Sequence, residues 1–361
     1  MAFSAADHAH MARALRLAER GLYTTTPNPR VGCVIVRDGV VVGEGWHARA
    51  GEPHAEVHAL RMAGERARGA TAYVTLEPCS HHGRTPPCAN ALIDAGLSRV
   101  VAAMRDPNPQ VAGGGISLLT LAGIQAEVGL LEAEARELNI GFVARMTRGR
   151  PWLRVKTASS LDGGTALLNG ESKWITGAAA RADVQAWRAR ACAILTGVGT
   201  VLADDPQMNV RDFATPRQPL KIIVDSRLNT PPTARILQGG AVIVCAEDDP
   251  PRQAALEAAG AEIWRIPGPA GRVGLAALIL ELGRRGLNEI HVEAGATLDG
   301  ALLDAGLVDE WVAYLAPLVM GDAARGVFAL PPLATMAERK AFELLDSRQL
   351  GGDLRLTLRP R

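Results

Sequence analysis

The chain has 361 residues, of which 48% are hydrophobic and 21% are charged, and its formal net charge is +1. This composition is normal for a globular protein, and a balanced charge without a long basic run argues against disorder and against a large nucleic-acid-binding surface. A chain of this length exceeds one ordinary hydrophobic core, so two domains of roughly 150–200 residues each are expected.

The first predicted element is an amphipathic helix over residues 5–20, because Met11, Leu15 and Ala18 share one face opposite charged residues. This stretch lacks the hydrophobic run and cleavage site of a signal peptide, and no apolar stretch approaches the ~20 residues that span a bilayer. The five cysteines are thinly spread, at positions 33, 79, 88, 192 and 245. We therefore expect a cytoplasmic protein, in which clustered cysteines indicate a metal or a catalytic site more often than disulfides.

Helices and strands alternate through the first half of the chain. Residues 31–46 predict a hairpin that turns at Asp38-Gly39, while the glycines at 113–115 are expected to form a loop. The hairpin is followed by a helix over about 54–66, a strand over 71–78, a helix after Cys88 and a strand over 98–104. This alternation predicts a sheet with helices on both faces.

The domain boundary is expected around residues 146–152. A charged helix predicted over 132–146 ends there, and Gly149, Arg150 and Pro151 interrupt the periodic pattern. The α/β pattern then restarts, with helices predicted over 178–190, 252–259, 273–286 and 297–306, and strands over 152–158, 191–197, 220–226, 241–246, 262–267, 289–295 and 309–317. No internal repeat relates the halves, so we expect two different α/β domains, residues 1–148 and 149–361.

Two stretches of the first half together predict a metal site, PHAEVHAL at 53–60 and PCSHHGRTPPC at 78–88. His54, Cys79 and Cys88 supply one nitrogen and two sulfurs, which suits tetrahedral zinc. Three protein ligands leave a fourth position for water, the arrangement of a catalytic zinc. Glu56 would not bind the metal but could take a proton from that water and return it to a leaving group.

The spacing of the cysteines leaves an alternative open. Nucleobase deaminases carry His-x-Glu followed by Pro-Cys, but two residues separate their cysteines where this chain has eight. A structural zinc would take His58 or His82 as a fourth ligand, since His54 and His58 share a helix face, but it would leave Glu56 without a role. Ordinary surface or core positions are expected for the remaining candidates, namely Cys33, His8, His10 and His291.

Four stretches closely resemble the deaminase half of the bifunctional riboflavin-biosynthesis deaminase/reductase family: TPNPRVG at 26–32, GWH at 45–47, AGEPHAE at 50–56 and EPCSHHGRTPPC at 77–88. The eight-residue spacing is that family's own form. The resemblance implies a cytidine-deaminase-like three-layer domain in which His54, Cys79 and Cys88 bind Zn²⁺ and Glu56 moves protons. It also implies that Asn28, which equally suits a turn, contacts the substrate, with His47 and His81 near its ring or phosphate.

The second half has no G-x-G-x-x-G between a strand and a helix, so the standard dinucleotide-binding fingerprint is absent. Gly197 and Gly199 are expected to mark a tight strand end. The better phosphate candidate is residues 290–303, where a strand ends at Glu293 and small residues lead into a helix whose first N–H groups can face a phosphate. The alternative is that Gly295 serves only the turn.

Five further stretches resemble the reductase half of the same family: KTASSLDG at 156–163, GESKWIT at 170–176, VLADDP at 201–206, VDSR at 224–227 and VEAGATL at 292–298. The resemblance therefore spans nearly the whole chain, and it implies a dihydrofolate-reductase-like C-terminal domain that uses NADPH. The implied NADPH contacts are Ala158, Trp174, Thr200, Asp204, Ser226, Gly295, Ala296, Thr297, Leu298, Asp299, Gly300 and Ala301. The implied substrate contacts are Ser172, Arg188, Met208, Arg211 and Glu293.

Several of these residues have a second interpretation. The two arginines suit a 5′-phosphate but could be solvated charges, and Trp174 could belong to the core. Ser226 with Arg227 would favour the extra phosphate of NADPH. Lys156 and Asp204 are both candidates for proton transfer during reduction.

The function that the resemblance implies has two steps. Zinc-dependent hydrolytic deamination of 2,5-diamino-6-(5-phosphoribosylamino)pyrimidin-4(3H)-one would precede NADPH-dependent reduction of the ribosyl group to 5-amino-6-(5-phosphoribitylamino)uracil. An RNA-editing or tRNA deaminase is disfavoured, because aromatic residues make up only 4% of the chain and its charge is balanced. A non-catalytic protein with structural zinc is the other alternative. We expect a small-molecule substrate, no nucleic-acid or membrane partner, and a homo-oligomer.

Overall fold

The computed structural model describes residues 3–80, 87–109 and 111–361. Contacts within the chain divide it into two compact units, Met1–Gly149 and Arg150–Arg361. None of the described helices is long and apolar enough to cross a bilayer.

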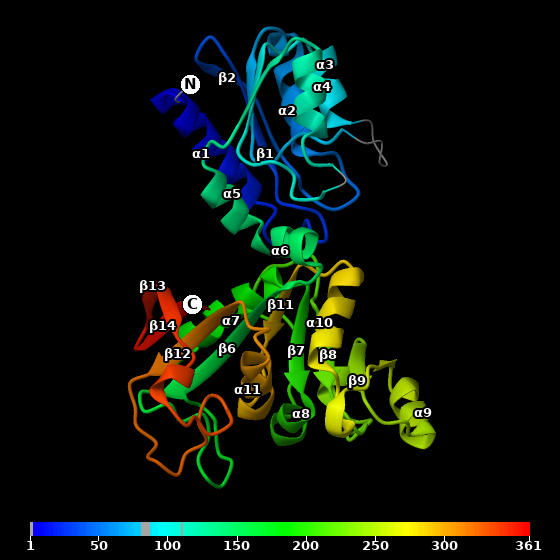
Figure 1. Cartoon of the computed structure of the whole chain (residues 1–361), viewed down its shortest axis with the longest axis vertical. Coiled ribbons are helices and arrows are strands. Elements are labelled where there is room, and N and C mark those ends of the chain that lie inside the picture. Colours follow the sequence, from blue (N-terminus) through cyan, green and yellow to red (C-terminus); the bar gives the residue numbers. More distant parts are fainter. Residues whose placement is uncertain (1–2, 81–86, 110) are drawn as a thin grey trace. The chain divides into compact units, whose positions relative to one another are not determined.

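The first unit contains a five-stranded sheet in the order β2-β1-β3-β4-β5 (Figure 1). The expected hairpin is present, and Asp38 and Gly39 both have positive φ at its turn, as the right-handed twist of a tight hairpin requires. The remaining strands run parallel to one another, with β3 antiparallel to β1. The strands are β1 (Gly32–Arg37), β2 (Val40–Trp46), β3 (Thr71–Val74), β4 (Arg99–Ala102) and β5 (Gln125–Val128).

Helices cover both faces of this sheet: α1 and α5 lie on one side, and α2, α3 and α4 on the other (Figure 1). Their bounds are α1 (Ala5–Glu19), α2 (Ala55–Ala63), α3 (Cys88–Asp94), α4 (Gly114–Leu121), α5 (Glu132–Leu138) and α6 (Ile140–Arg148). Glycines allow the closest approaches. A Cβ on Gly43 or Gly45 of β2 would lie 2.2 or 2.3 Å from a backbone oxygen of α2, so α2 packs directly on the strand.

Three predictions for this unit were wrong in detail. The strand expected over 71–78 ends at Val74, and the helix expected over 132–146 is two helices that meet at Asn139. Gly114 and Gly115 open α4 rather than forming a loop, because their helix begins against another segment that accepts its N–H groups. The strand β5 was not predicted, since its four residues alternate weakly.

The second unit contains a nine-stranded sheet in the order β10-β9-β8-β7-β11-β6-β12-β14-β13. The first seven of these strands are parallel, and the C-terminal pair is an antiparallel hairpin. The strands are β6 (Trp152–Ser160), β7 (Ala193–Gly197), β8 (Leu220–Val224), β9 (Ala241–Cys245), β10 (Ala261–Arg265), β11 (Glu289–Val292), β12 (Glu310–Ala316), β13 (Phe342–Leu350) and β14 (Asp353–Pro360).

Alternate residues of the central strands feed two separate cores in the second unit, one on each face of the sheet. Leu195 and Ile222 belong to one core, and their neighbours Ile194 and Ile223 belong to the other. Strands buried on both faces therefore read as continuous hydrophobic runs. The helices are α7 (Ala178–Arg190), α8 (Val198–Asp204), α9 (Pro250–Ala258), α10 (Leu275–Arg284) and α11 (Ala296–Asp304).

One helix and one hairpin of two strands in the second unit escaped prediction. The helix α8 spans only seven residues, too few for a helical period to show. The hairpin β13–β14 contributes few buried side chains, and most of β13 is exposed, so its sequence lacks the alternation of a half-buried strand.

A buried charge cluster ties three neighbouring strands of the second unit together. Arg154 of β6 is 1% exposed and donates hydrogen bonds to Glu310 of β12 (2.5 Å) and Glu289 of β11 (3.2 Å). Its guanidinium also lies 4.5 Å from the ring centroid of Trp187. Each carboxylate also has a second arginine partner, Arg190 for Glu289 at 2.7 Å and Arg359 for Glu310 at 3.1 Å, so Arg154 is the fully buried arginine that the two carboxylates share.

We predict that Arg154→Ala lowers the free energy of unfolding of the second unit by roughly 3–5 kcal/mol, because it leaves buried carboxylates short of a partner. Denaturant unfolding followed by circular dichroism measures the change. Arg265→Ala is the control, since Arg265 forms only an exposed pair with Asp248, and should shift stability by less than ~1 kcal/mol. Equal effects of the two substitutions would contradict the role given to the buried cluster.

Candidate active sites

The beginning of α2 positions two of the predicted residues of the metal site. His54 is the N-cap, with an extended backbone at φ −75° and ψ 167°, so its side chain leaves the helix axis. Glu56 lies in the first turn and is 3% exposed. Because Gly45 of β2 has no side chain, α2 lies against the strand, and this packing fixes where both side chains begin.

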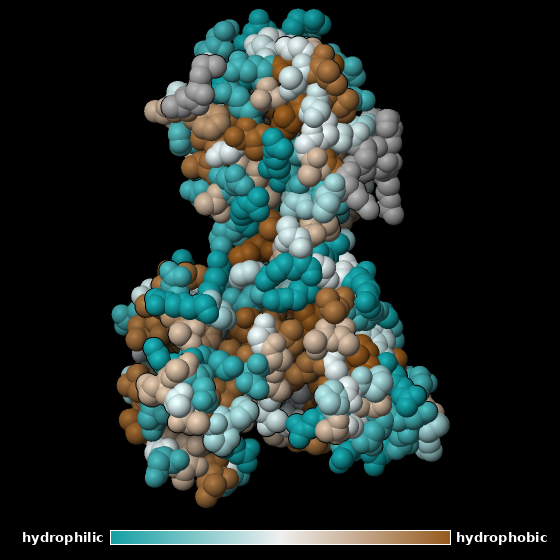
Figure 2. Space-filling model, viewed as in Figure 1, coloured by the Kyte–Doolittle hydropathy of each residue, from teal (hydrophilic) through white to brown (hydrophobic). Residues whose placement is uncertain are grey.

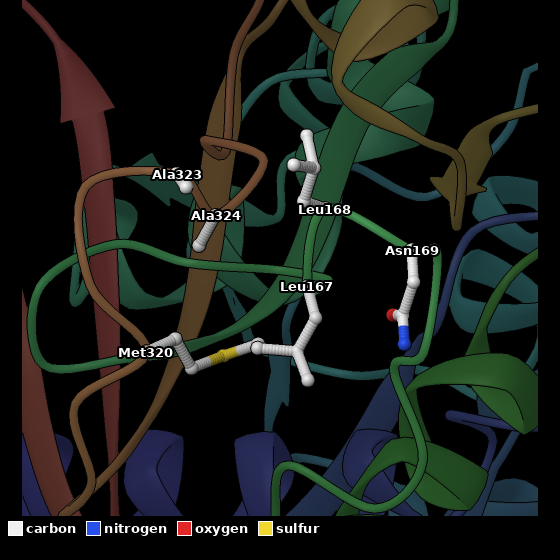
Figure 3. A pocket seen from close by; sticks show the side chains of 6 residues that line it. All are labelled: Leu167, Leu168, Asn169, Met320, Ala323 and Ala324. Atoms are coloured by element: carbon white, nitrogen blue, oxygen red, sulfur yellow. The ribbon is translucent and has the colours of Figure 1, made fainter.

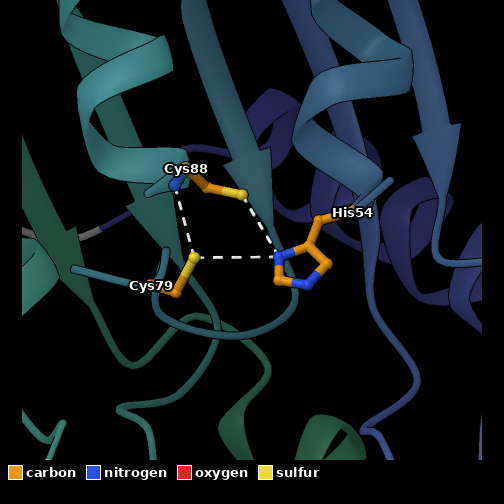
Figure 4. A group of neighbouring side chains, drawn as sticks. All are labelled: His54, Cys79 and Cys88. Atoms are coloured by element: carbon orange, nitrogen blue, oxygen red, sulfur yellow. Dashed lines mark hydrogen bonds between the residues drawn. The ribbon is translucent and has the colours of Figure 1, made fainter. Parts of the chain in front are cut away.

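The two cysteines come from separate segments. Cys79 follows β3 in a loop, and Cys88 is the first residue of α3. His54 Nδ1 lies 3.7 Å from Cys79 Sγ and 3.3 Å from Cys88 Sγ, and Figure 4 shows the three side chains pointing toward one another. Zinc bonds of ~2.0–2.3 Å in a tetrahedron keep ligand atoms roughly 3.5 Å apart, so this nitrogen and these two sulfurs fit a zinc ion.

Hydrogen bonds at the centre already favour a thiolate. The Cys88 side chain and His54 lower the pKa of Cys79, and the backbone N–H of Cys88 donates to Cys79 Sγ at 3.3 Å. The shared interaction with Cys79, together with burial, raises the pKa of Cys88. Because a metal binds the thiolate rather than the thiol, Cys79 is prepared for this task by its neighbours.

Glu56 is a buried carboxyl without a hydrogen-bond partner for its Oε2 among the described residues. Burial raises its pKa, and Cys88 interacts with it, so it lies beside the metal ligands without joining them. A carboxyl of raised pKa next to a reacting centre can hold and release a proton near neutral pH.

The fourth-ligand alternative finds no support in the described part of the chain. His54, Cys79 and Cys88 have ligand atoms within 4.8 Å of one another, and His58 is not a member of this group. His82, the other candidate, lies outside the described residues. Among the described residues the group therefore has three ligands, the number typical of a catalytic rather than a structural zinc.

Asn28 and His47 lie together on one side of the metal centre. The His47 ring meets the His54 ring edge-on at 5.3 Å between centroids, and its Nε2 lies 3.1 Å from Asn28 Nδ2. Its Nδ1 lies 3.2 Å from the Pro53 carbonyl, which can only accept, so Nδ1 carries the hydrogen and Nε2 accepts from Asn28. Burial lowers the pKa of His47, which agrees with this neutral form. His81 lies outside the described residues.

Sequence reasoning missed the residues that hold the Asn28 loop. The side chain of Asn139 accepts from Arg30 N at 2.8 Å and donates to Arg30 O at 2.9 Å, although 109 residues separate them. Arg145 donates to Pro27 O on the same loop. The one available signal was Asn139 itself, a poor helix former in the middle of a predicted helix.

In the second unit, four predicted cofactor residues lie at the carboxyl ends of adjacent parallel strands. Ala158 is near the end of β6, while Thr200, Ser226 and Gly295 follow β7, β8 and β11. A Cβ on Gly295 would lie 4.0 Å from Thr200 Oγ1, so α8 and α11 begin side by side. Ligands of open parallel sheets bind at this edge.

The start of α11 has the character of an anion site. Its N-cap is Gly295, and no side chain caps its first N–H groups. Asp299 on the same helix is 1% exposed, and neither carboxylate oxygen has a partner among the described residues. Burial raises the pKa of Asp299. Uncapped N–H groups and an orphaned buried carboxyl fit a site completed by a bound dinucleotide.

The other predicted residues of α11 divide between exposed and buried positions. Thr297 is exposed, Ala296, Leu298 and Ala301 are half-buried, and Gly300 is buried. A Cβ on Gly300 would lie 2.3 Å from the Ala329 carbonyl oxygen, so its close packing is against the protein.

Three of the predicted substrate residues, Arg188, Met208 and Glu293, form one connected group. Arg188 donates to both carboxylate oxygens of Glu293, at 2.5 and 2.8 Å, and to Asn209 O at 2.9 Å. It also contacts Met208 Sδ at 3.8 Å. Although burial opposes ionisation, the charge of Arg188 holds the pKa of Glu293 well below its usual range. Arg188 is therefore a buried partner of Glu293 rather than a solvated charge.

The remaining predicted residues lie on more open segments. Arg211 is exposed and reaches Asn209 Oδ1 at 2.8 Å. Trp174 is 71% exposed, which excludes it from the core, and the Lys173–Asp204 pair (3.0 Å) brings its segment to α8. Ser172 is half-buried beside it. Ser226 Oγ accepts from Val273 N at 3.1 Å.

His291 lies directly behind the substrate group and is a core residue, as expected. It is fully buried on β11, and its Nε2 lies 3.5 Å from Glu293 Oε1. Burial lowers the pKa of His291 to about 3, so it is neutral at physiological pH.

Comparisons with known proteins cover both units. Residues 4–104 match the family described as "Cytidine and deoxycytidylate deaminase zinc-binding region", and residues 151–356 match "RibD C-terminal domain". The chain is 52% identical to riboflavin biosynthesis protein RibD of Escherichia coli strain K12 over 98% of this chain and 99% of that one. It is 48% identical to the Haemophilus influenzae protein of the same name, over 99% of each chain.

Solved structures agree with this assignment over the whole length. Acinetobacter baumannii RibD superposes with a TM-score of 0.92 at 48% identity, over 99% of each chain. A Thermotoga maritima deaminase/reductase superposes with a TM-score of 0.87 at 31% identity, also over 99% of each chain. The predicted fold classes, with zinc in the first unit and NADPH in the second, are confirmed. The chain belongs to the RibD family, whose members join a zinc-dependent deaminase and an NADPH-dependent reductase for riboflavin biosynthesis in one polypeptide.

Proposed function

We propose that residues 1–148 deaminate a pyrimidine that carries a ribose phosphate, and that residues 149–361 reduce its ribosyl group. The Thermotoga maritima relative is named a diaminohydroxyphosphoribosylaminopyrimidine deaminase and 5-amino-6-(5-phosphoribosylamino)uracil reductase. The same two substrates are proposed here. The observation that carries the proposal is the convergence of His54, Cys79 and Cys88 beside the buried Glu56, whose Oε2 has no hydrogen-bond partner among the described residues.

In the deamination step, a zinc ion held by His54, Cys79 and Cys88 would supply a Lewis acid that activates a water. Glu56 would take a proton from the water as its oxygen adds to the amino-bearing ring carbon, and would give that proton to the amine as the C–N bond breaks and ammonia leaves. Because the Asn28 amide N–H faces His47, its amide oxygen is left to accept from the substrate. The two hydrogen bonds between the Asn139 side chain and the Arg30 backbone hold that loop in place.

In the reduction step, bound NADPH would supply the hydride that C1′ of the ribosyl group accepts in its open-chain imine form. The N-terminus of α11 would hold the cofactor pyrophosphate, and Ser226 with Arg227 would hold its extra phosphate. The exposed Arg211 takes the 5′-phosphate of the substrate, since Arg188 is engaged in holding Glu293.

Lys156 is proposed as the proton donor of the second step. It lies near the end of β6, and its ammonium is 5.7 Å from the centroid of the Tyr314 ring. Burial lowers its pKa, and Glu293, Asp299 and Arg188 surround it electrostatically. Asp204, the alternative, is partly exposed and paired with Lys173.

We also propose a homo-oligomer in the cytoplasm. Loops after β6 and β12 expose apolar side chains, with Leu168 76% and Val319 73% exposed, and Figure 2 shows hydrophobic surface over these loops. They border a shallow, open pocket lined mostly by apolar side chains: Leu167, Leu168, Asn169, Met320, Ala323 and Ala324 (Figure 3). A second copy would cover such a surface. A reducing compartment would keep the thiols of the metal centre available.

Incubation with the diaminopyrimidinone ribose phosphate tests the proposal directly. Without NADPH, we expect stoichiometric ammonia release and a deaminated product, because hydrolysis needs no nicotinamide. Addition of NADPH should then oxidise one equivalent of cofactor per product formed. Cofactor oxidation without prior ammonia release would contradict the proposed order of the steps.

We predict that Glu56→Gln lowers the deaminase rate by about 10²–10⁴-fold, since it removes the proton carrier. Zinc content should stay at one ion per chain, and the reductase rate should not change. Ammonia release and elemental analysis measure both effects. Glu65→Gln, an exposed carboxylate beyond the same helix, is the control; wild-type deamination by Glu56→Gln would refute this role.

We predict that Lys156→Met lowers the reductase kcat by about 10²-fold or more while deamination continues. A donor must be protonated, so wild-type kcat should fall as pH rises through the Lys156 pKa, which burial places below the usual 10.5. This decrease of kcat at alkaline pH should be absent in the variant. Lys221→Met is the control, because Lys221 is also buried but lies at the amino end of β8. If kcat of Lys156→Met still falls at alkaline pH as in the wild type, Lys156 is not the proton donor.

A further inference from the structure

Glu77 is a buried carboxylate that lies two residues before the metal ligand Cys79. It is 3% exposed, and its side chain accepts four backbone hydrogen bonds. Its Oε2 accepts from Asp106 N at 3.1 Å and from Gly113 N at 3.0 Å. Its Oε1 accepts from Gly115 N at 3.0 Å and from Ile116 N at 3.2 Å.

Three of these donors belong to the beginning of α4. Gly113 is the N-cap of this helix, at a left-handed φ of 82° that favours glycine, and no side chain of its own segment caps it. The first N–H groups of a helix lack partners within the helix and carry partial positive charge. Glu77 therefore caps α4 from another part of the chain. The backbone N–H groups of the glycine run at 113–115 surround its carboxylate.

The same glycines place α4 against the loop that carries Cys79. A Cβ on Gly115 would lie 1.9 Å from the Pro78 carbonyl oxygen, and one on Gly114 would lie 2.5 Å from Ser80 Oγ. At Gly115 no other residue type fits without movement of the backbone, whereas at Gly114 the Ser80 side chain would have to move. Residues 78–80 are thus held on one side by the first turn of α4.

The loop is also fixed on its other side. Glu77 N donates to Met104 O at 2.9 Å, and Ala89 N of α3 donates to Cys79 O at 3.2 Å. Cys79 therefore sits between α3, which begins with the ligand Cys88, and α4, which Glu77 holds in place. The family match of the zinc-binding region ends at residue 104, before all four donors to the Glu77 side chain.

We propose that Glu77 is a positioning residue of the metal centre. Its hydrogen bonds hold the first turn of α4 against residues 78–80. This packing positions Cys79 Sγ relative to His54 and Cys88, and the position of Cys79 affects the affinity for zinc. Groups that orient metal ligands from behind typically change metal affinity by about 10–100-fold when they are replaced. The residue touches neither zinc nor substrate, so its effect should appear in metal retention first.

Glu77→Gln in the full-length, zinc-loaded protein tests this role. The substitution keeps the shape of the side chain but replaces one carboxylate oxygen with an NH₂ group. An NH₂ group cannot accept hydrogen bonds, so some of the four backbone N–H groups lose their acceptor. We expect zinc to transfer to a chromogenic chelator about 10–100-fold faster than from the wild type. Deamination without added zinc should fall, excess zinc should restore most of kcat, and the reductase rate in the same chain should stay unchanged.

Asp7→Asn is the matched control. Asp7 is also a buried carboxylate of the first unit and accepts from Tyr73 and Arg99 at 2.6 Å each, but it does not contact the loop of Cys79. It should destabilise the unit without hastening zinc transfer. Equal zinc loss from Asp7→Asn and Glu77→Gln would overturn the proposal, as would wild-type zinc retention by Glu77→Gln.

A second variant covers the case in which Glu77→Gln does not fold, as judged by limited proteolysis. Glu77→Asp keeps the charge but withdraws it by one methylene, so it should give a folded protein with intermediate zinc transfer. A folded Glu77→Asp protein that retains zinc like the wild type would equally overturn the proposal.

Discussion

A zinc ion can be held in the first unit only if one imidazole and two thiolates meet within bonding reach, although 34 residues separate the first ligand from the last. The fold meets this constraint with helix starts and a strand end. His54 precedes α2, Cys79 follows β3, and Cys88 opens α3. Small residues let α2 and α4 approach the backbone closely, so helix packing brings together the segments that carry the ligands. The same burial leaves the Oε2 atom of Glu56 without a hydrogen-bond partner among the described residues.

The second unit gathers its residues by a related rule on a different sheet. Parallel strands end at one edge, so residues distant in sequence collect where β6, β7, β8 and β11 finish. The polar residues there are not independent contacts. Arg188 donates hydrogen bonds to Glu293, and His291 lies behind this pair. The carboxylate charge of Glu293, which could face a substrate, is therefore oriented by its neighbours. Electrostatic preorganisation of this kind lowers the cost of ordering charges during reaction.

Sequence alone predicted what is local in the chain. The ligand set at 54, 79 and 88 and the family of both halves followed from short motifs. Long-range support could not be predicted. Nothing near Glu77 shows that its partners lie at 106–116, and nothing near Arg30 points to Asn139, because such contacts depend on the finished packing. Arg188 is buried because a tertiary partner, Glu293, compensates its charge, whereas the split of the predicted helix at Asn139 agrees with the low helix propensity of asparagine and with its bonds to Arg30.

The geometry of the metal centre is tested most directly by X-ray absorption at the zinc edge of the purified protein. The account predicts two sulfur ligands at ~2.3 Å, one imidazole nitrogen at ~2.0–2.1 Å and one further light atom without the multiple scattering of a ring. A second imidazole, or a third sulfur, would close the open position. Either result would contradict the assignment of a hydrolytic zinc centre to this unit.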